Sequence, residues 1–141
     1  MADNGKKTGS CMCGGVKFAL DKEITGFSAC HCHMCRRWAS SPWFATDCGK
    51  VVRFEGEENI GRFKSSNWAE RGFCKICGSS LFYFLIPTGH YMMSVGAFDD
   101  QNGIEMKLQA FMDEKPDCYD FTNQNERLTG QEVFEKYAPK D

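Results

Sequence analysis

Short stretches in which apolar and polar residues alternate follow one another along most of the chain, with glycine-containing turns between them. In the clearest stretch, 9–20, Val16, Phe18 and Leu20 alternate with smaller or charged residues, and a period of two residues predicts a strand. Similar patterns predict strands at 61–66, 81–86, 91–98 and 107–113, and two strand segments within 43–54. Repeated short strands joined by turns are typical of a mainly β domain built of short antiparallel strands.

Helical patterns are few. Residues 26–38 lack a clean alternation and are interpreted as a loop that opens a short helix at about 34–39. Near the end of the chain, apolar residues recur at helical spacing and predict a short C-terminal helix over 129–138.

Length and composition fit one domain with a sizeable core. We place this domain at 9–141, after a flexible tail at 1–8. With 42% hydrophobic and 26% charged residues, the chain is not of the disordered class. The net charge of −2 provides no strong field for nucleic acid or a membrane surface. The longest apolar run, 81–86, is too short to cross a bilayer, and no secretory signal is recognisable. We therefore expect a cytoplasmic protein without nucleic-acid or membrane partners.

Nine cysteines are far more than a chain of 141 residues ordinarily contains, and in a reducing compartment they favour metal binding or catalysis over disulfides. Cys11 and Cys13 lie in a predicted strand, where residues i and i+2 point to the same face. Cys74 and Cys77 form a turn closed by Gly78. Two such pairs supply four thiolates, which predicts a closed tetrahedral zinc site with a structural role.

The third group, Cys30, Cys32 and Cys35, has no obvious fourth cysteine beside it. Three protein ligands and an open position are typical of a catalytic zinc. Two alternatives remain open: a second structural site closed by His31, His33 or Cys48, and a redox-active pair formed by Cys32 and Cys35. The two histidines alternate with the ligands and are expected to face away from the metal. Cys48 and Cys118 are isolated and are interpreted as buried thiols.

Three segments, GSCMCGGVKF (9–18), CHCHMCRRW (30–38) and ERGFCKICGSSL (70–81), together resemble the glutathione-dependent formaldehyde-activating enzyme family, which includes centromere-protein-V-like proteins. The resemblance covers roughly 9–121. It implies a β-tent fold, a structural zinc held by Cys11, Cys13, Cys74 and Cys77, a catalytic zinc held by Cys30, Cys32 and Cys35, and carbon–sulfur lyase activity on S-(hydroxymethyl)glutathione. One departure follows Lys115-Pro116, where Asp-Cys-Tyr stands in place of the tryptophan that many members carry nearby, and this leaves the identity of the thiol open.

Glutathione carries two carboxylates, so its site should contain fixed cations, for which the guanidinium fork of arginine is well suited. Arg36 and Arg37 directly follow the ligand Cys35, and Lys64 and Arg71 lie in the middle of the chain. From these we predict substrate-binding roles for Arg36, Arg37 and Arg71, with Trp38 and Trp43 as candidate pocket walls.

Two functional hypotheses follow. The first is a zinc-dependent carbon–sulfur lyase that acts on the adduct of a small thiol, such as glutathione, with an aldehyde such as formaldehyde. The second is a non-catalytic, zinc-stabilised binding module. A dithiol oxidoreductase is a third possibility, although a thioredoxin-like βαβ pattern is missing around Cys32 and Cys35.

Overall fold

Two β-sheets form the framework of the molecule in the computed structural model, which describes residues 7–137. The small sheet has the order β1-β2-β5, and the large sheet has the order β11-β10-β3-β4-β9-β8-β7-β6. The small sheet consists of β1 (Lys7–Ser10), β2 (Lys17–Leu20) and β5 (Arg53–Glu55). The large sheet consists of β3 (Gly26–Cys30), β4 (Trp43–Asp47), β6 (Ile60–Ser66), β7 (Ala69–Cys74), β8 (Ser80–Leu85), β9 (His90–Ser94), β10 (Glu105–Ala110) and β11 (Glu126–Arg127).

Helices are short and lie between or beside the strands. The α-helices are α1 (His33–Ala39) and α2 (Gly130–Tyr137), and single 3₁₀ turns are η1 (Glu57–Asn59), η2 (Val95–Ala97) and η3 (Met112–Glu114). The predicted mainly β fold with a short C-terminal helix is confirmed. No helix within residues 7–137 is long and apolar enough to span a membrane.

The structure differs from the predicted elements in detail. Residues 9–20 are not one strand, because the chain turns between β1 and β2: the Gly14 amide donates to the Cys11 carbonyl at 3.2 Å, and Gly14 has φ +79°. The segment interpreted as a loop contains β3, and β7 was not predicted. Most pairs are antiparallel, but β10 pairs in parallel with β3 and β11. Residues 1–6 of the predicted N-terminal tail lie outside the described part of the chain, whereas Lys7 and Thr8 belong to β1. The last residue of the predicted C-terminal helix also lies outside the described part.

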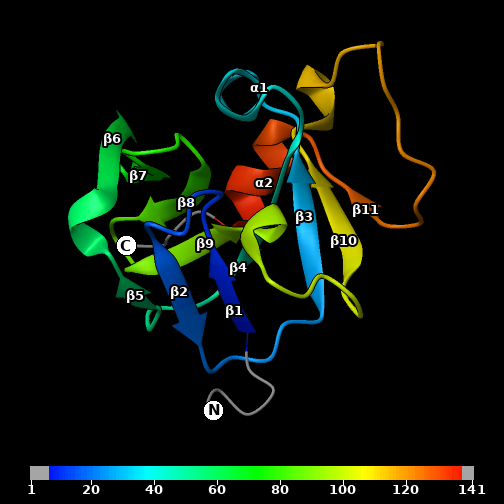
Figure 1. The fold of residues 1–141 in the computed structure, drawn as a ribbon. Helices are drawn as coiled ribbons and strands as arrows, with labels where there is room; N and C mark the ends of the chain where they lie inside the picture. The colour runs from blue at the N-terminus through cyan, green and yellow to red at the C-terminus, as the bar shows by residue number, and fades with distance from the viewer. Residues whose placement is uncertain (1–6, 138–141) are drawn as a thin grey trace.

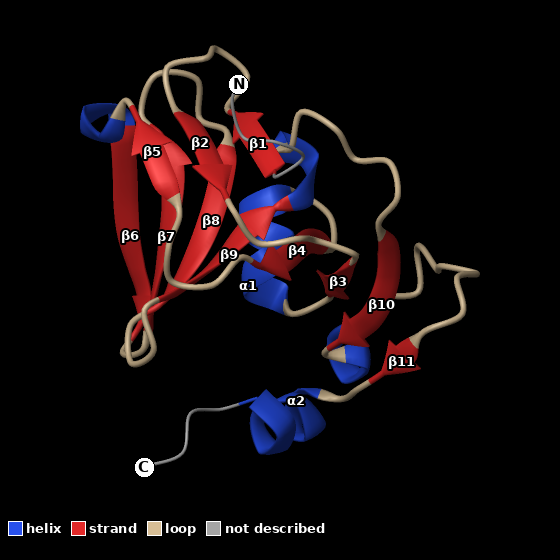
Figure 2. Ribbon diagram, turned by 90° about the horizontal axis from the view of Figure 1, so that it is seen from below, coloured by secondary structure: helices blue, strands red, loops and turns tan. Residues whose placement is uncertain are grey.

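The small sheet packs against β8 and β9 of the large one, as Figure 1 shows with β1 and β2 in front of them. Phe18 and Leu20 of β2, Leu81 and Phe82 of β8, and Met93 of β9 are at most 3% exposed in this core. A second, smaller core cluster surrounds α1 and contains Cys32, Cys35, Trp43 and Ala45. Helix α2 lies at the edge of the molecule, near η3 (Figure 2).

Candidate metal centres

Four cysteines from two turns converge at one place in the fold. Cys11 and Cys13 lie in the turn between β1 and β2, whereas Cys74 ends β7 and Cys77 lies in the turn that follows. Their four Sγ atoms all lie within 4.8 Å of one another. The Sγ atom of Cys13 is 3.6 Å from that of Cys11 and 3.8 Å from that of Cys74. The predicted grouping is confirmed, although a turn and not a strand brings Cys11 and Cys13 together.

These distances fit a tetrahedral zinc ion. Zinc–sulfur bonds of about 2.3 Å in a tetrahedron separate the sulfur atoms by about 3.8 Å. Donor groups also surround the sulfurs: the Val16 amide lies 3.3 Å from Cys11 Sγ, and the Gly15 amide lies 3.3 Å from Cys13 Sγ. A hydrogen bond from the Ser79 hydroxyl to Cys77 Sγ, at 3.2 Å, lowers the pKa of that thiol to about 5. The group can therefore hold a metal ion with all four positions filled by protein.

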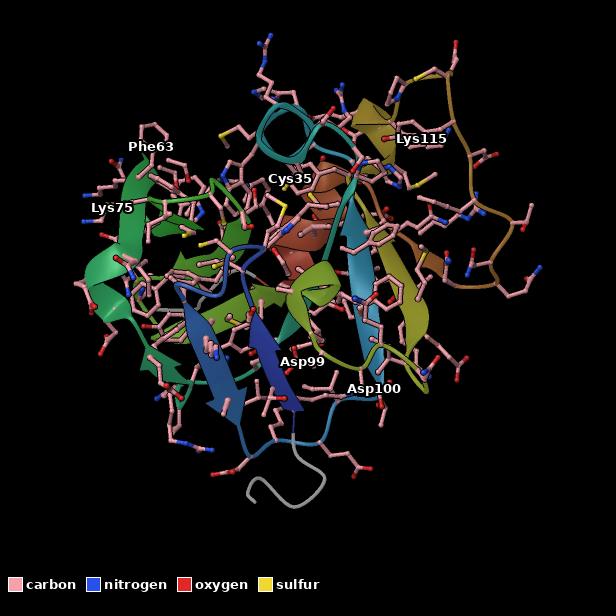
Figure 3. The ribbon with its side chains drawn as sticks, in the orientation of Figure 1. Cys35, Phe63, Lys75, Asp99, Asp100 and Lys115 are labelled. Atoms are coloured by element: carbon pink, nitrogen blue, oxygen red, sulfur yellow. The ribbon has the colours of Figure 1, made fainter. Side chains whose placement is uncertain are left out.

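The second group gathers where β3 ends and α1 begins. Cys30 is the last residue of β3, Cys32 is the N-cap of α1 and Cys35 lies in its first turn. Their Sγ atoms lie within 4.8 Å of one another. Cys32 Sγ accepts the Cys35 amide at 3.3 Å, so the same atom caps the helix and belongs to the cluster. Figure 3 shows Cys35 pointing from α1 toward the interior of the molecule.

Crowding gives these three thiols unequal acidities. Hydrogen bonds from Cys30 and Cys35 lower the pKa of Cys32 to about 2, whereas hydrogen bonding to Cys32 raises the pKa of Cys30. A divalent cation would stabilise all three as thiolates, which is the form in which cysteine binds metals. The donor set therefore fits a metal ion such as zinc.

A fourth protein ligand is missing from this second group within residues 7–137. His31 is fully buried but points elsewhere, with Nδ1 2.9 Å from the Tyr119 hydroxyl and Nε2 2.9 Å from Gln109 Oε1. His33 is 3.2 Å from Glu114. Cys48 belongs to the other core cluster, where burial raises its pKa to about 12, whereas Cys118 is exposed and not buried as predicted. None of the three residues considered as closing ligands lies in the group.

Arg71 of β7 lies beside the three thiols. Its Nη1 atom donates to Cys35 Sγ at 3.6 Å, and its Nε atom donates to Ser65 Oγ at 3.3 Å. The guanidinium makes cation–π contacts with two rings, with its Cζ atom 5.1 Å from the ring centroid of Trp38 and 5.2 Å from that of Tyr83. The residue is 5% exposed and forms no ion pair with the carboxylates in the described part of the chain. A buried cation without an acidic partner is costly unless an anion offsets it.

The other predicted cations lie differently. Arg36 donates from Nε to the His31 carbonyl at 2.8 Å and from Nη2 to the Glu114 carbonyl at 3.2 Å, which ties α1 to η3. Arg37 is exposed on α1. Lys64 of β6 is opposite Glu70 in the register, on the face of the strand away from Arg71. The structure therefore brings one of the three predicted substrate-binding arginines, Arg71, into contact with the cysteine group.

Aromatic residues complete the surroundings of the three thiols. Trp38 meets Trp43 edge-on with ring centroids 5.1 Å apart, and Trp43 donates from Nε1 to Ser94 Oγ at 2.9 Å. Tyr83 and Phe111 also pack against the cluster. Neither Tyr83 nor Phe111 was predicted from the sequence as part of the site. The position of Tyr83 follows from its register opposite Arg71 in the β7–β8 pair, which the unpredicted strand β7 concealed.

Comparison with known proteins identifies the family. The model of the glutathione-dependent formaldehyde-activating enzyme family matches residues 6–114. The chain belongs to this family. An uncharacterized lyase of Schizosaccharomyces pombe is 38% identical over 128 residues, which cover 89% of this chain and 93% of the relative. A crystal structure of a Rhodobacter sphaeroides protein shares the fold, with a TM-score of 0.56 and 22% identity over 71% of this chain and 99% of that chain.

The family match contains both cysteine groups and Arg71, and it ends at Glu114. The segment after that residue, which carries Tyr119 and α2, lies beyond it. Part of the surroundings of the three-cysteine group therefore comes from residues outside the matched range, because Phe134 of α2 contacts Phe111.

Proposed function

We propose that this chain is a zinc-dependent carbon–sulfur lyase that acts on the adduct of a small thiol with an aldehyde, of the type of S-(hydroxymethyl)glutathione. Membership of the glutathione-dependent formaldehyde-activating enzyme family and similarity to a lyase support this reaction class. The observation that carries the proposal is the contrast between the two cysteine groups. Four sulfurs fill a tetrahedron in one group, whereas three sulfurs beside a buried, unpaired arginine leave a ligand position in the other.

In this reaction the carbon–sulfur bond of the adduct breaks and a proton moves from oxygen to sulfur. In the adduct R–S–CH₂–OH, the carbon–sulfur bond breaks with its electron pair going to sulfur, and the hydroxyl loses its proton as the C=O bond of the aldehyde forms. The products are R–SH and the aldehyde, and the reverse direction forms the adduct. A zinc ion held by Cys30, Cys32 and Cys35 would supply a Lewis acid that favours the thiolate form of the substrate sulfur at neutral pH.

In this proposal Arg71 supplies the fixed positive charge. Three thiolates exceed the charge of a divalent ion by one, and a substrate thiolate adds another negative charge. Arg71 donates to Cys35 Sγ from a buried position, where its charge interacts more strongly than it would in water. Contacts with the rings of Trp38 and Tyr83 hold the guanidinium, so it is in place before the substrate arrives.

The four-cysteine group has a structural role in this proposal. A metal ion held by Cys11, Cys13, Cys74 and Cys77 would join the β1–β2 turn of the small sheet to the end of β7 in the large sheet. All nine cysteines are free thiols, which agrees with the reducing cytoplasm that we infer as the location of the protein.

A test compares adduct cleavage by the zinc-loaded protein with the spontaneous reaction. The interconversion of formaldehyde, thiol and hydroxymethyl thioether is followed by exchange NMR, first with glutathione and then with a panel of small thiols. We expect acceleration by the parent protein and none by Cys32→Ser, with Cys118→Ser as the matched control at an exposed cysteine. If no thiol in the panel gives acceleration and both zinc ions resist chelation, the lyase proposal is wrong and the protein is a zinc-stabilised binding module.

A further inference from the structure

Five aromatic side chains form a continuous rim beside the three-cysteine group. We call these residues, Trp38, Trp68, Tyr83, Phe111 and Phe134, the aromatic rim. Trp38 and Tyr83 both make cation–π contacts with Arg71. The Trp68 indole donates from Nε1 to the Tyr83 hydroxyl at 3.2 Å.

The remaining contacts close the rim on the other side. The ring of Phe134 lies edge-on to Trp68, with centroids 6.3 Å apart, and edge-on to Phe111 at 5.8 Å. Phe111 in turn packs against the cluster that contains Cys32 and Cys35. The rim is partly open to solvent, since Trp68 is 42% and Phe134 is 50% exposed. Exposed aromatic surface beside a candidate reactive centre is available to an apolar ligand.

Arg71 is the cation that faces this rim within residues 7–137. Its Nε and Nη1 atoms donate to Ser65 Oγ and Cys35 Sγ, and its Nη2 atom has no hydrogen-bond partner among the described residues. Nη2 can therefore donate to one carboxylate of a ligand.

Other nearby cations are directed elsewhere. Two backbone carbonyls occupy Arg36, and Lys64 lies on the opposite face of β6. Arg37 is exposed on α1, and no hydrogen bond or ion pair joins it to the rim among the described residues. Lys115, with a side chain 13% exposed, lies near Tyr119 and is 3.8 Å from a carboxylate oxygen of Asp120.

This charge distribution differs from what glutathione requires. Two carboxylates in one ligand call for at least two fixed cations, whereas the rim offers one, which already donates to Cys35 Sγ. Aromatic rings, by contrast, gain free energy by burying apolar surface and stacking on other rings.

We propose that the thiol whose adduct this site takes is a small thiol with an aromatic or apolar body and at most one carboxylate, in place of glutathione. The inference rests on the proposed lyase function and specifies its substrate class. Phe134 completes the rim from α2, which lies beyond the part of the chain that matches the family. Its position depends on Gly130, where an added Cβ would lie 2.6 Å from the Phe111 ring.

The experiment compares two hydroxymethyl adducts, those of benzyl mercaptan and glutathione, on the full zinc-loaded chain. We expect kcat/KM to be at least about tenfold higher for the benzyl adduct, because stacking against the rim contributes on the order of 1.4 kcal/mol. Phe134→Ala should remove most of this preference through a higher KM for the benzyl adduct. Phe134→Leu, which keeps an apolar side chain, should retain part of it.

Tyr137→Ala is the matched control. Tyr137 is on the same helix and is 51% exposed, but among the described residues its ring contacts Lys136 and none of the rim. Its removal should leave both kcat/KM values unchanged. Equal or better cleavage of the glutathione adduct by the parent protein would overturn the substrate class and leave the lyase function intact. Failure to cleave either adduct, or any other in the panel, would overturn the lyase function itself. The comparison in the parent protein is decisive even if a Phe134 variant does not fold.

Discussion

Cys13 and Cys74 are 61 residues apart in the chain, and their sulfur atoms are 3.8 Å apart in the fold. Through this contact the turn between β1 and β2 meets the end of β7, so the small sheet is joined to the large sheet at one corner. The core between the two sheets lies directly behind this corner, since Cys11 and Cys74 are themselves part of it. A metal ion at this position would therefore stabilise the whole domain and not a single loop.

Replacing Cys74 with serine should destabilise the entire domain. Metal binding that occurs only in the folded state contributes to the free energy of unfolding. A loss of about 3 kcal/mol would lower the unfolding midpoint by roughly 10 °C in a chain of this size. Differential scanning calorimetry together with zinc content measures both effects. The Cys118→Ser protein, changed at an exposed cysteine, should unfold at the parent temperature. An unchanged midpoint for Cys74→Ser would contradict a structural metal at this site.

Replacing Cys32 with serine should have the opposite consequence. Serine is a favoured N-cap residue, so its hydroxyl can still accept the Cys35 amide and preserve the start of α1. The unfolding midpoint should therefore change little, while the cluster loses one of three sulfurs and with it the second zinc and adduct cleavage.

In the parent protein a mild chelator should remove this second zinc first, because one of its ligand positions is open to solvent or substrate. A second zinc that resists chelation as strongly as the first would exclude an open site.

Much of this fold was predictable because its signals are local. Metal-ligand spacing, the alternation within β2 and β8, and the helical spacing in α2 each depend on residues close together in the chain. The turn at Cys11–Gly15 was not predicted, because the alternation of apolar and polar residues in β2 continues into the residues before it. The positive φ of Gly14, at which the chain reverses, leaves no signal in the hydrophobic pattern. Strand β3 was missed because Gly26, Ser28 and Ala29 are small residues in the interior of a sheet, where alternation is lost.

The sequence predicted the candidate metal ligands of the site but not the residues that surround them. Cys30, Cys32 and Cys35 lie within six positions, so their convergence follows from the sequence alone. The contact of Arg71 with Tyr83 depends on the register between β7 and β8, which is a property of the folded sheet. The same holds for Arg36, whose position beside Cys35 suggested substrate binding. In the fold its guanidinium donates to the His31 carbonyl and to the Glu114 carbonyl of η3. Whether an arginine is free to bind substrate or is occupied by groups of the protein depends on partners that are distant in sequence.

Arg71→Met should abolish most of the adduct cleavage while the zinc content stays at the parent value. Methionine preserves much of the stacking volume between Trp38 and Tyr83 but removes the charge and the hydrogen bond to Cys35 Sγ. Hydrogen bonds to charged groups contribute about 1.5–3 kcal/mol, so kcat/KM should fall by roughly 10- to 150-fold. Arg71→Lys should recover part of the loss, because the charge returns without the planar guanidinium.

Lys64→Met provides the control for Arg71, because Lys64 lies on the paired strand β6 and faces away from the site. This variant should change kcat/KM by less than about twofold, since exposed surface charges contribute little. If the two methionine variants have equal activities, Arg71 has no part in the reaction. A loss of zinc from Arg71→Met would instead assign the arginine a role in holding the cysteine group together.

Gly130→Ala should lower the unfolding midpoint although it places a better helix former in α2. Alanine is favoured over glycine within helices by about 1 kcal/mol, so propensity alone predicts a gain in stability. An added Cβ, however, would lie 2.6 Å from Cδ1 and Cε1 of Phe111, which cannot easily move: its backbone has φ +58°, and its ring packs against the cysteine cluster and Phe134. Overpacking of this kind costs about 1–3 kcal/mol, which exceeds the gain from propensity. Calorimetry of Gly130→Ala beside Gln131→Ala, a change at the next, exposed position, measures the difference. A higher midpoint for Gly130→Ala would show that Phe111 does not fix the position of α2.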